Sequence, residues 1–111
     1  MDFSQTNIKT DKEMKFSEVL DALKNGERLT NATLSDMMAF IVRHNHNIVP
    51  AEVVPKMNSL PESTKQHING SDLEFIDQVL LVYWSPMQER YIATSFIPTW
   101  HDIFREDWTI A

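Results

Sequence analysis

The side chains in this sequence that are best suited to binding a ligand are aromatic rings and small polar groups. Flat rings stack on planar ligands, at about 1–3 kcal/mol per stacked nucleobase. Thr99 and Asp102 carry oxygens that can hydrogen-bond the hydroxyls of a sugar, and arginines suit phosphate because the guanidinium presents several fixed donors. The rings suited to stacking are Trp84, Tyr91, Phe96, Trp100 and Trp108, and the candidate counter-charges for phosphate are Arg28, Arg43 and Arg90.

Each of these residues also has a purely structural interpretation. Thr99 and Asp102 have the spacing of a capping box, in which two side chains satisfy the first amides of a helix. Trp108 can be a core residue that anchors the C-terminal stretch, and Arg90 lies in a polar turn where arginines are usually solvated. From the residues alone, both interpretations of the C-terminal stretch stay open.

The sequence offers no recognisable catalytic constellation. Its two glycines both occupy turn positions, so a glycine-rich phosphate loop is excluded. The absence of cysteine excludes thiolate zinc sites and disulfides. Glu106 and Asp107 are adjacent, and adjacent carboxylates rarely converge on one substrate, while His44 and His46 are interpreted as solvated loop residues. We therefore expect a protein that is not an enzyme and has no cofactor and no bound metal.

The charge and hydropathy of the chain limit the classes of partner that it is expected to bind. Its 111 residues carry a formal net charge of −6, which repels the phosphates of DNA and RNA. The longest apolar run, Val79 to Trp84, is far shorter than the roughly 20 residues that cross a bilayer. The N-terminus shows no secretory pattern. We expect a cytoplasmic protein with neither a nucleic-acid nor a membrane partner.

Hydrophobic periodicity predicts the elements that would position these residues. Apolar residues at 16, 19, 20 and 23 predict a helix that Ser17 can cap and that Asn25-Gly26 ends. Strands are predicted over 27–30, 37–42, 73–84 and 91–97, with a polar turn at 31–36, a short helix up to about residue 68 and a last strand at 108–110. The 73–84 segment is predicted as the central strand, with both faces covered by the fold or by a partner subunit because its second half is wholly apolar.

These elements predict an α+β fold, namely a twisted antiparallel sheet with an N-terminal helix and short additional helices. Residues 1–13 are polar and are predicted to form a flexible arm. Residues 14–111 are predicted to form a single compact domain, an ordinary size for one hydrophobic core.

Two motifs resemble a known family. The start reads Phe16-Ser17-Glu18-Val19-Leu20 and continues to Leu23-Lys24-Asn25-Gly26, and the end combines Pro98-Thr99, Asp102-Ile103 and Glu106-Asp107-Trp108. This order resembles the small phage proteins of the second type of the Thoeris anti-defence family. Those proteins begin with a "Phe-x-x-Ala-Leu-x-x-Leu-Lys-x-Gly" helix and end with "Pro-Ser-x-x-Asp-Leu-x-x-x-Asp-Trp". The resemblance covers residues 14–34 and 91–111, whereas residues 44–78 match only in general layout.

The resemblance implies a sponge that binds a cyclic ADP-ribose isomer made by bacterial immune enzymes and holds it intact. Relatives also bind cyclic oligonucleotides, and they assemble as homotetramers with pockets between protomers. It further implies residence in the host cell cytoplasm. The expected ligand contacts in this chain are Arg28, Leu34, Phe40, Trp84, Pro98, Thr99, Trp100 and Asp102.

The chain departs from the family pattern at one position that bears on its ligand. Leu34 stands where the family carries a Trp, and a leucine offers no π-face for stacking. Either another ring, such as Trp100 or Trp84, takes over, or the ligand differs. The alternative function is an acidic phage protein that inhibits a host protein by direct contact. An enzyme acting on a cyclic nucleotide is a third possibility.

Overall fold

A computed structural model describes residues 12–111, which divide into two compact units. The first unit joins residues up to 44 with residues 78–111, and the second comprises residues 45–77. The predicted arm falls almost wholly outside the described residues. The single domain predicted for 14–111 stays a prediction, because each unit is described here by itself.

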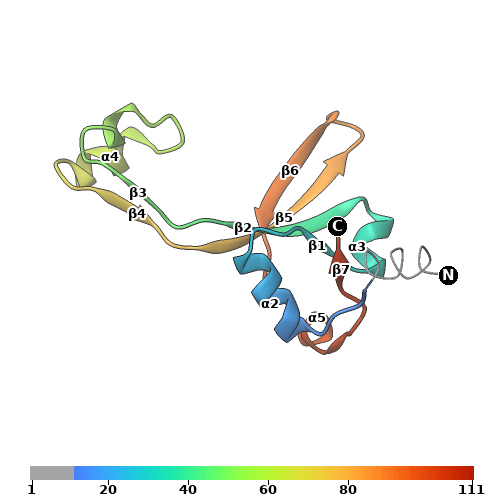
Figure 1. Ribbon diagram of the computed structural model, residues 1–111. Coiled ribbons are helices and arrows are strands. Elements are labelled where there is room, and N and C mark those ends of the chain that lie inside the picture. Colours follow the sequence, from blue (N-terminus) through green and yellow to red (C-terminus); the bar gives the residue numbers. More distant parts are fainter. Residues whose placement is uncertain (1–11) are drawn as a thin grey trace. The chain divides into compact units, whose positions relative to one another are not determined.

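The first unit is built on a five-stranded antiparallel sheet with the strand order β6-β5-β2-β1-β7 (Figure 1). Its strands are β1 (Leu29–Thr30), β2 (Ala39–His44), β5 (Gln78–Ser85), β6 (Arg90–Ser95) and β7 (Thr109–Ile110). Strands β5 and β6 form the predicted hairpin, with Leu80 paired to Ser95 and Ser85 paired to Arg90. The mixed α+β class predicted from the sequence is confirmed.

Helix α2 (Phe16–Lys24) covers one face of this sheet, where it contacts β1 and β2. Its buried residues, Val19 and Leu23, are two of the four apolar positions that the helical periodicity predicted. Phe16 is partly buried against the same core, whereas Leu20 is 47% exposed. The helix ends as expected, because Gly26 takes a left-handed φ of 85° that glycine adopts without strain. Its start differs from the prediction: Glu18 Oε1, not Ser17, accepts the hydrogen bond from the Lys15 amide at 2.9 Å.

The C-terminal tail completes the core of this unit. Trp108 is fully buried, and its ring packs edge-on against Phe16 and Phe96 at centroid distances of 5.8 and 6.3 Å. Its indole N–H donates to the carbonyl of Asp102 at 3.0 Å. The main chain is tied down as well, since the Met14 amide donates to the Trp108 carbonyl at 2.7 Å. The interpretation of Trp108 as a core anchor is therefore confirmed.

Two sequence predictions for this unit are wrong. The predicted polar turn at 31–36 is helix α3 (Ala32–Asp36), because the side chain of Asn31 caps it by accepting from the Leu34 amide at 2.9 Å. The predicted strand 73–84 breaks at residues 76–77 into β4 (Leu73–Phe75) and β5, which belong to different sheets. Strand β2, rather than that segment, is the centre of the sheet.

The second unit is a small two-stranded sheet with two helical turns. Strand β3 (Asn47–Val49) pairs antiparallel with β4, and the segment between them holds the 3-10 helix η1 (Val54–Lys56) and helix α4 (Glu62–Ile68). The Lys65 ammonium group donates to the carbonyls of Pro55 and Met57 at 3.0 and 2.9 Å, which holds η1 against α4. Across the sheet, His46 Nε2 lies 2.5 Å from Glu74 Oε2.

None of the helices between residues 12 and 111 is both long enough and apolar enough to span a bilayer. The described helices are short, and α2 with nine residues is the longest of them.

The docking of Trp108 predicts a large stability effect. Trp108→Ala removes a fully buried ring and leaves the Asp102 carbonyl without its indole donor, so we expect a loss of about 3–5 kcal/mol in the free energy of unfolding. Urea denaturation followed by circular dichroism measures it. Trp100→Ala is the matched control, because Trp100 is 73% exposed and should cost less than about 1 kcal/mol. Equal losses in the two variants would contradict the anchor role.

Candidate functional site

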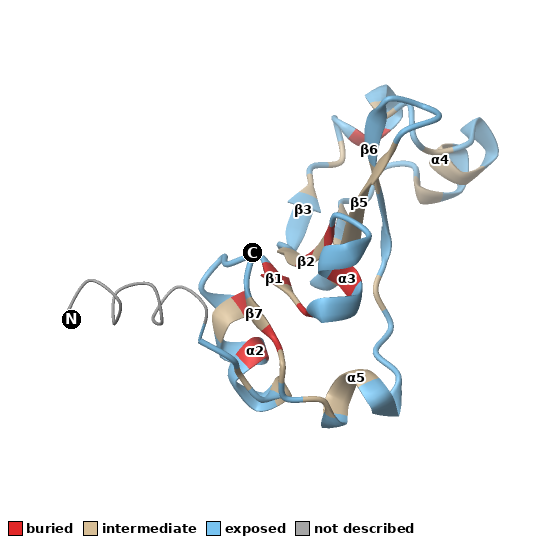
Figure 2. Cartoon of the chain, turned by 90° about the vertical axis from the view of Figure 1, so that its right-hand side faces the viewer, coloured by how far each residue is buried: buried red, intermediate tan, exposed pale blue. Residues whose placement is uncertain are grey.

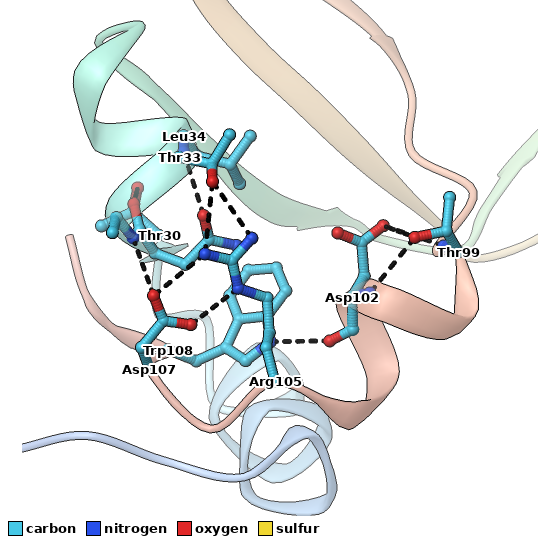
Figure 3. A network of polar contacts seen from close by, with 10 residues as sticks. Thr30, Thr33, Leu34, Thr99, Asp102, Arg105, Asp107 and Trp108 are labelled. Atoms are coloured by element: carbon cyan, nitrogen blue, oxygen red, sulfur yellow. Dashed lines mark hydrogen bonds and ion pairs between the residues drawn. The ribbon is translucent and has the colours of Figure 1, made fainter.

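Helix α5 (Trp100–Phe104) carries the predicted capping box, and the box is formed (Figure 3). The Thr99 hydroxyl accepts from the Asp102 amide at 3.2 Å, and Asp102 Oδ2 accepts from the Thr99 amide at 2.8 Å. The Thr99 hydroxyl also donates to the same carboxylate oxygen at 3.0 Å. The structural interpretation of this pair is therefore correct, and the cap holds the turn in a defined conformation.

The cap engages only one oxygen of the Asp102 carboxylate. Its other oxygen, Oδ1, makes no hydrogen bond within the part of the chain that the structure describes. Pro98, Thr99 and Trp100 are exposed around it. The Trp100 ring stacks on Phe104 at 5.7 Å with an interplanar angle of 21°. The turn thus presents a carboxylate oxygen and, on another part of the same helix, two exposed rings, which are groups able to bind a sugar hydroxyl and a flat ring.

A second group of predicted residues lies on the face of the sheet opposite α2. Side chains alternate along a strand, and Val79, Leu81 and Tyr83 of β5 pack on the core. Trp84 therefore points to the other face, and by the register of β2 and β5 so does Phe40. The Arg28 guanidinium lies 5.3 Å from the centre of the Phe40 ring, so a cation and rings share this outer face.

The eight predicted site residues thus fall into three groups. Pro98, Thr99, Trp100 and Asp102 belong to the α5 turn, and α5 contacts α2 on the core side of the sheet. Leu34 is only 9% exposed and packs in the core, where it offers a ligand little surface. Arg28, Phe40 and Trp84 lie on the outer face, so one chain alone does not bring all the predicted contacts to one place.

A polar clamp that the sequence did not reveal joins the tail to α3 (Figure 3). Arg105 binds Asp107 with both of its parallel donors, from Nε to Oδ1 at 2.6 Å and from Nη2 to Oδ2 at 2.9 Å. The same guanidinium donates to the Thr33 hydroxyl at 3.3 Å from Nη1 and from Nη2, while Asp107 Oδ2 accepts from the Ala32 amide at 3.2 Å. The carboxylate thus sits at the N-terminal end of α3, where negative charge is favourable.

The clamp shifts the pKa of both of its charged groups. The hydrogen bond from Arg105 is the main reason that the pKa of Asp107 falls from 3.8 to about 2, and the Ala32 amide adds to the effect against the opposing cost of burial. The same bond raises the pKa of Arg105. The pair therefore stays ionised over the whole physiological range and holds the tail next to the first turn of α3.

Two hollows of this unit lie near the clamp. A groove of about 420 Å³ between α2 and α5 is lined by apolar side chains that include Phe16, Leu20 and Phe104. A polar depression of about 310 Å³ is lined by residues that include Thr30, Asn31 and Asp107. The Nδ2 group of Asn31 is buried without a partner among the described residues. Neither hollow is lined by any of the eight predicted contacts.

Metal chemistry has no support in the described residues, since residues 12–111 hold no group of three or more His, Asp or Glu side chains able to bind an ion.

The clamp is not visible in the sequence because its partners lie far apart in the chain, as Thr33 and Arg105 do. The only local sign was Asn31 before a short polar segment, which is a favoured helix cap.

The shifted pKa of Asp107 gives a pH-dependent prediction. Because the folded pKa of about 2 lies below the ordinary 3.8, the clamp contributes stability above about pH 4 and loses it as the pH falls towards 2. We expect Asp107→Asn to lower the free energy of unfolding at pH 7 by about 1–3 kcal/mol. The gap between wild type and variant should shrink between pH 4 and pH 2, as measured by urea denaturation at a series of pH values.

The adjacent Glu106 supplies the control for this experiment. It is exposed, and Glu106→Gln changes the net charge by the same amount without touching the clamp. This variant should stay within about 0.5 kcal/mol of wild type at every pH. A gap between Asp107→Asn and wild type that did not change with pH would show that the carboxylate charge is not what stabilises the tail.

Comparison with known proteins gives the family of this chain. No curated protein matches the sequence significantly. Residues 14–111 match the family model described as Tad2-like, the Thoeris anti-defense 2-like domain. The match covers nearly the whole chain, including the segment 44–78 that resembled the family only in layout, and it confirms the resemblance seen in the terminal motifs. The chain therefore belongs to the Tad2-like family of Thoeris anti-defense 2-like domains, and this membership implies a function in Thoeris anti-defence.

Proposed function

We propose that this protein binds a cyclic ADP-ribose-type immune signal and sequesters it without breaking or forming a bond. Family membership over residues 14–111 is the observation that carries the ligand class. The effect on the immune pathway would follow from mass action alone, because a bound signal is not available to its effector. Cyclic oligonucleotides are a second ligand class with the same chemistry of bases, riboses and phosphates.

The α5 turn is the proposed ribose subsite. Asp102 Oδ1, which the capping box does not use, is the proposed acceptor for a ribose hydroxyl, and the box fixes its direction before the ligand arrives. Trp100 is exposed in the same turn, and its ring is the proposed face for a base in place of the Trp that Leu34 replaces. Capping and ligand binding do not compete, because they use different oxygens of one carboxylate.

The outer face of the sheet is the proposed second part of the pocket. Arg28 is the counter-charge for a phosphate, and Phe40 and Trp84 offer apolar surface beside it. The α5 turn contacts α2 on the core side of the same sheet, so within one chain the two groups face different sides of the sheet. A pocket that uses both groups therefore needs a second copy of the chain, which agrees with the homotetramer that we propose for this protein.

The sponge proposal predicts binding without turnover. Incubation with a cyclic ADP-ribose isomer should raise the melting temperature, since a ligand present at 100 times its dissociation constant stabilises the folded state by about 2.7 kcal/mol. Heating the complex should then release the ligand unchanged, as judged by chromatography and mass spectrometry. Linear ADP-ribose is the control ligand. Conversion of the recovered ligand would indicate an enzyme.

The absence of any melting shift with cyclic ADP-ribose isomers or cyclic oligonucleotides would contradict sequestration. It would favour the alternative that this acidic protein inhibits a host protein by contact. The exposed stacked pair Trp100 and Phe104 is the observation that favours this second candidate, because large exposed rings mark protein-binding surfaces. Capture of one defined host protein, lost in a Trp100→Ala variant, would support it.

Asp102 gives a test that separates the cap from the ligand contact. Asp102→Asn keeps an amide oxygen for the cap but removes the second acceptor, so we expect the variant to melt close to wild type and to bind a cyclic ADP-ribose isomer at least about 10-fold more weakly. Isothermal titration calorimetry measures the affinity. Thr99→Ser, which keeps the capping hydroxyl, is the matched control and should bind within about threefold of wild type. Full affinity in Asp102→Asn would remove Asp102 from the site.

A further inference from the structure

The sequence contains two Asn-Gly dipeptides, Asn25-Gly26 and Asn69-Gly70, and both asparagines are exposed. An asparagine that precedes glycine is chemically labile, because the next main-chain nitrogen can attack the side-chain amide carbon and glycine has no side chain to obstruct the approach. Both glycines have a left-handed φ, of 85° and 84°, and only their chain neighbours lie within 4 Å of where a Cβ would be. The local sequence and the space around the glycines therefore do not distinguish the two sites.

Hydrogen bonds at the end of α2 close the first of these sites. The Gly26 amide donates to the Leu23 carbonyl at 3.0 Å. The Glu27 amide donates to the Ala22 carbonyl at 3.1 Å, and the two bonds together form the Schellman motif that ends a helix. Leu23 is buried in the core, so the Gly26 nitrogen is released only if the end of α2 unwinds from that core. The attacking nitrogen of this site is therefore engaged in the folded protein.

The second site lies in an open turn after α4. The turn is of type II, with φ −36° and ψ 126° at Asn69, and the Ser71 amide closes it by donating to the Ile68 carbonyl at 3.0 Å. The Gly70 amide has no hydrogen-bond partner among residues 12–111. Helix α4 has no buried residue, and Figure 2 draws it without the colour of buried residues. The peptide after Asn69 can therefore turn towards the side chain at little cost in free energy.

We propose that Asn69 is a site of spontaneous deamidation in the folded protein. The Gly70 nitrogen loses its proton to base and forms a bond to Cγ of Asn69. The bond from Cγ to Nδ2 then breaks, and the leaving nitrogen takes up a proton and departs as ammonia. The product is a five-membered succinimide ring, which water opens at either carbonyl to give aspartate or isoaspartate. The reaction consumes one water, releases one ammonia and needs no enzyme and no cofactor.

The modification changes both the charge and the main chain of the second unit. Either product adds a carboxylate to a chain whose net charge is −6, at the C-terminal end of α4, where negative charge is unfavourable. Isoaspartate also carries the chain through its side chain, which lengthens the main chain by one methylene group. The hydrogen bond from Ser71 to Ile68 spans this point, so we expect isoaspartate to break it. The turn between α4 and β4 is then loosened.

Ageing of the wild-type protein tests the proposal. The protein is incubated in mildly alkaline buffer and then digested rapidly at acidic pH, where the reaction is slow. Mass spectrometry of the peptides should show the mass gain of an amide-to-acid exchange at Asn69, appearing at least about 10-fold faster than at Asn25. Fragmentation that separates isoaspartate from aspartate should find both products at residue 69. Equal rates at the two sites, or faster conversion at Asn25, would overturn the proposal.

The same protein unfolded in guanidinium chloride is the matched control, because it keeps both dipeptides and removes the structure around them. The two rates should then agree within about threefold, since the Gly26 amide is no longer held by α2. A difference as large as that in the folded protein would assign the selectivity to the flanking residues, and it would overturn the structural argument.

Amide hydrogen exchange measures the effect on the turn. In aged wild-type protein, the Ser71 amide should lose its protection in the fraction that carries isoaspartate, because its hydrogen bond to Ile68 is broken. Asn69→Gln is the matched variant, since its longer side chain closes a ring far more slowly. After the same incubation this variant should keep the protection of the fresh protein. Retained protection of Ser71 in the isoaspartate fraction would overturn the proposed effect on the turn.

Discussion

The burial of Trp108 is the constraint on which the first unit depends. The ring contacts the helix through Phe16, meets the chain leaving the sheet at Phe96, and holds the carbonyl of Asp102 through its indole nitrogen. A single side chain thus fixes the helix, the end of the hairpin strand and the α5 turn relative to one another. The burial of this ring determines where the C-terminal tail lies. The capping box and the clamp then fix the local conformation of the tail.

The elements with local signals could be predicted from the sequence. The α2 stripe, its Gly26 stop and the Thr99–Asp102 box all depend on residues within a few positions of each other, and all are present. Prediction failed where distant contacts decide the structure. The sequence predicts one strand over residues 73–84, because an apolar run does not show that Ile76 and Asp77 lie outside both strands. Strand order cannot be predicted either, since it is set by pairing between segments far apart in the sequence.

The candidate site shows the same division. Thr99, Trp100 and Asp102 can be proposed from the sequence because a short motif carries both the cap, which is formed, and exposed groups. That Arg28 and Phe40 interact could not be seen, since their contact arises from the register of two strands. The clamp between Arg105, Asp107 and α3 was also invisible, because an Arg-x-Asp pattern is common on protein surfaces and only the fold brings Thr33 to it. Sequence motifs therefore indicate candidate groups, and the topology decides which of these groups meet.

The long separation in sequence between Trp108 and the residues of α2 and β1 that it covers has a consequence for biosynthesis. During translation α2 and β1 leave the ribosome long before the residue that covers them, so Val19, Leu23 and Leu29 remain without their largest partner until the tail emerges. The closing strand β7 pairs with β1 at the same late stage. The nascent chain thus cannot complete this unit in the order in which it is made, and its folding is expected to finish as a single late step rather than gradually.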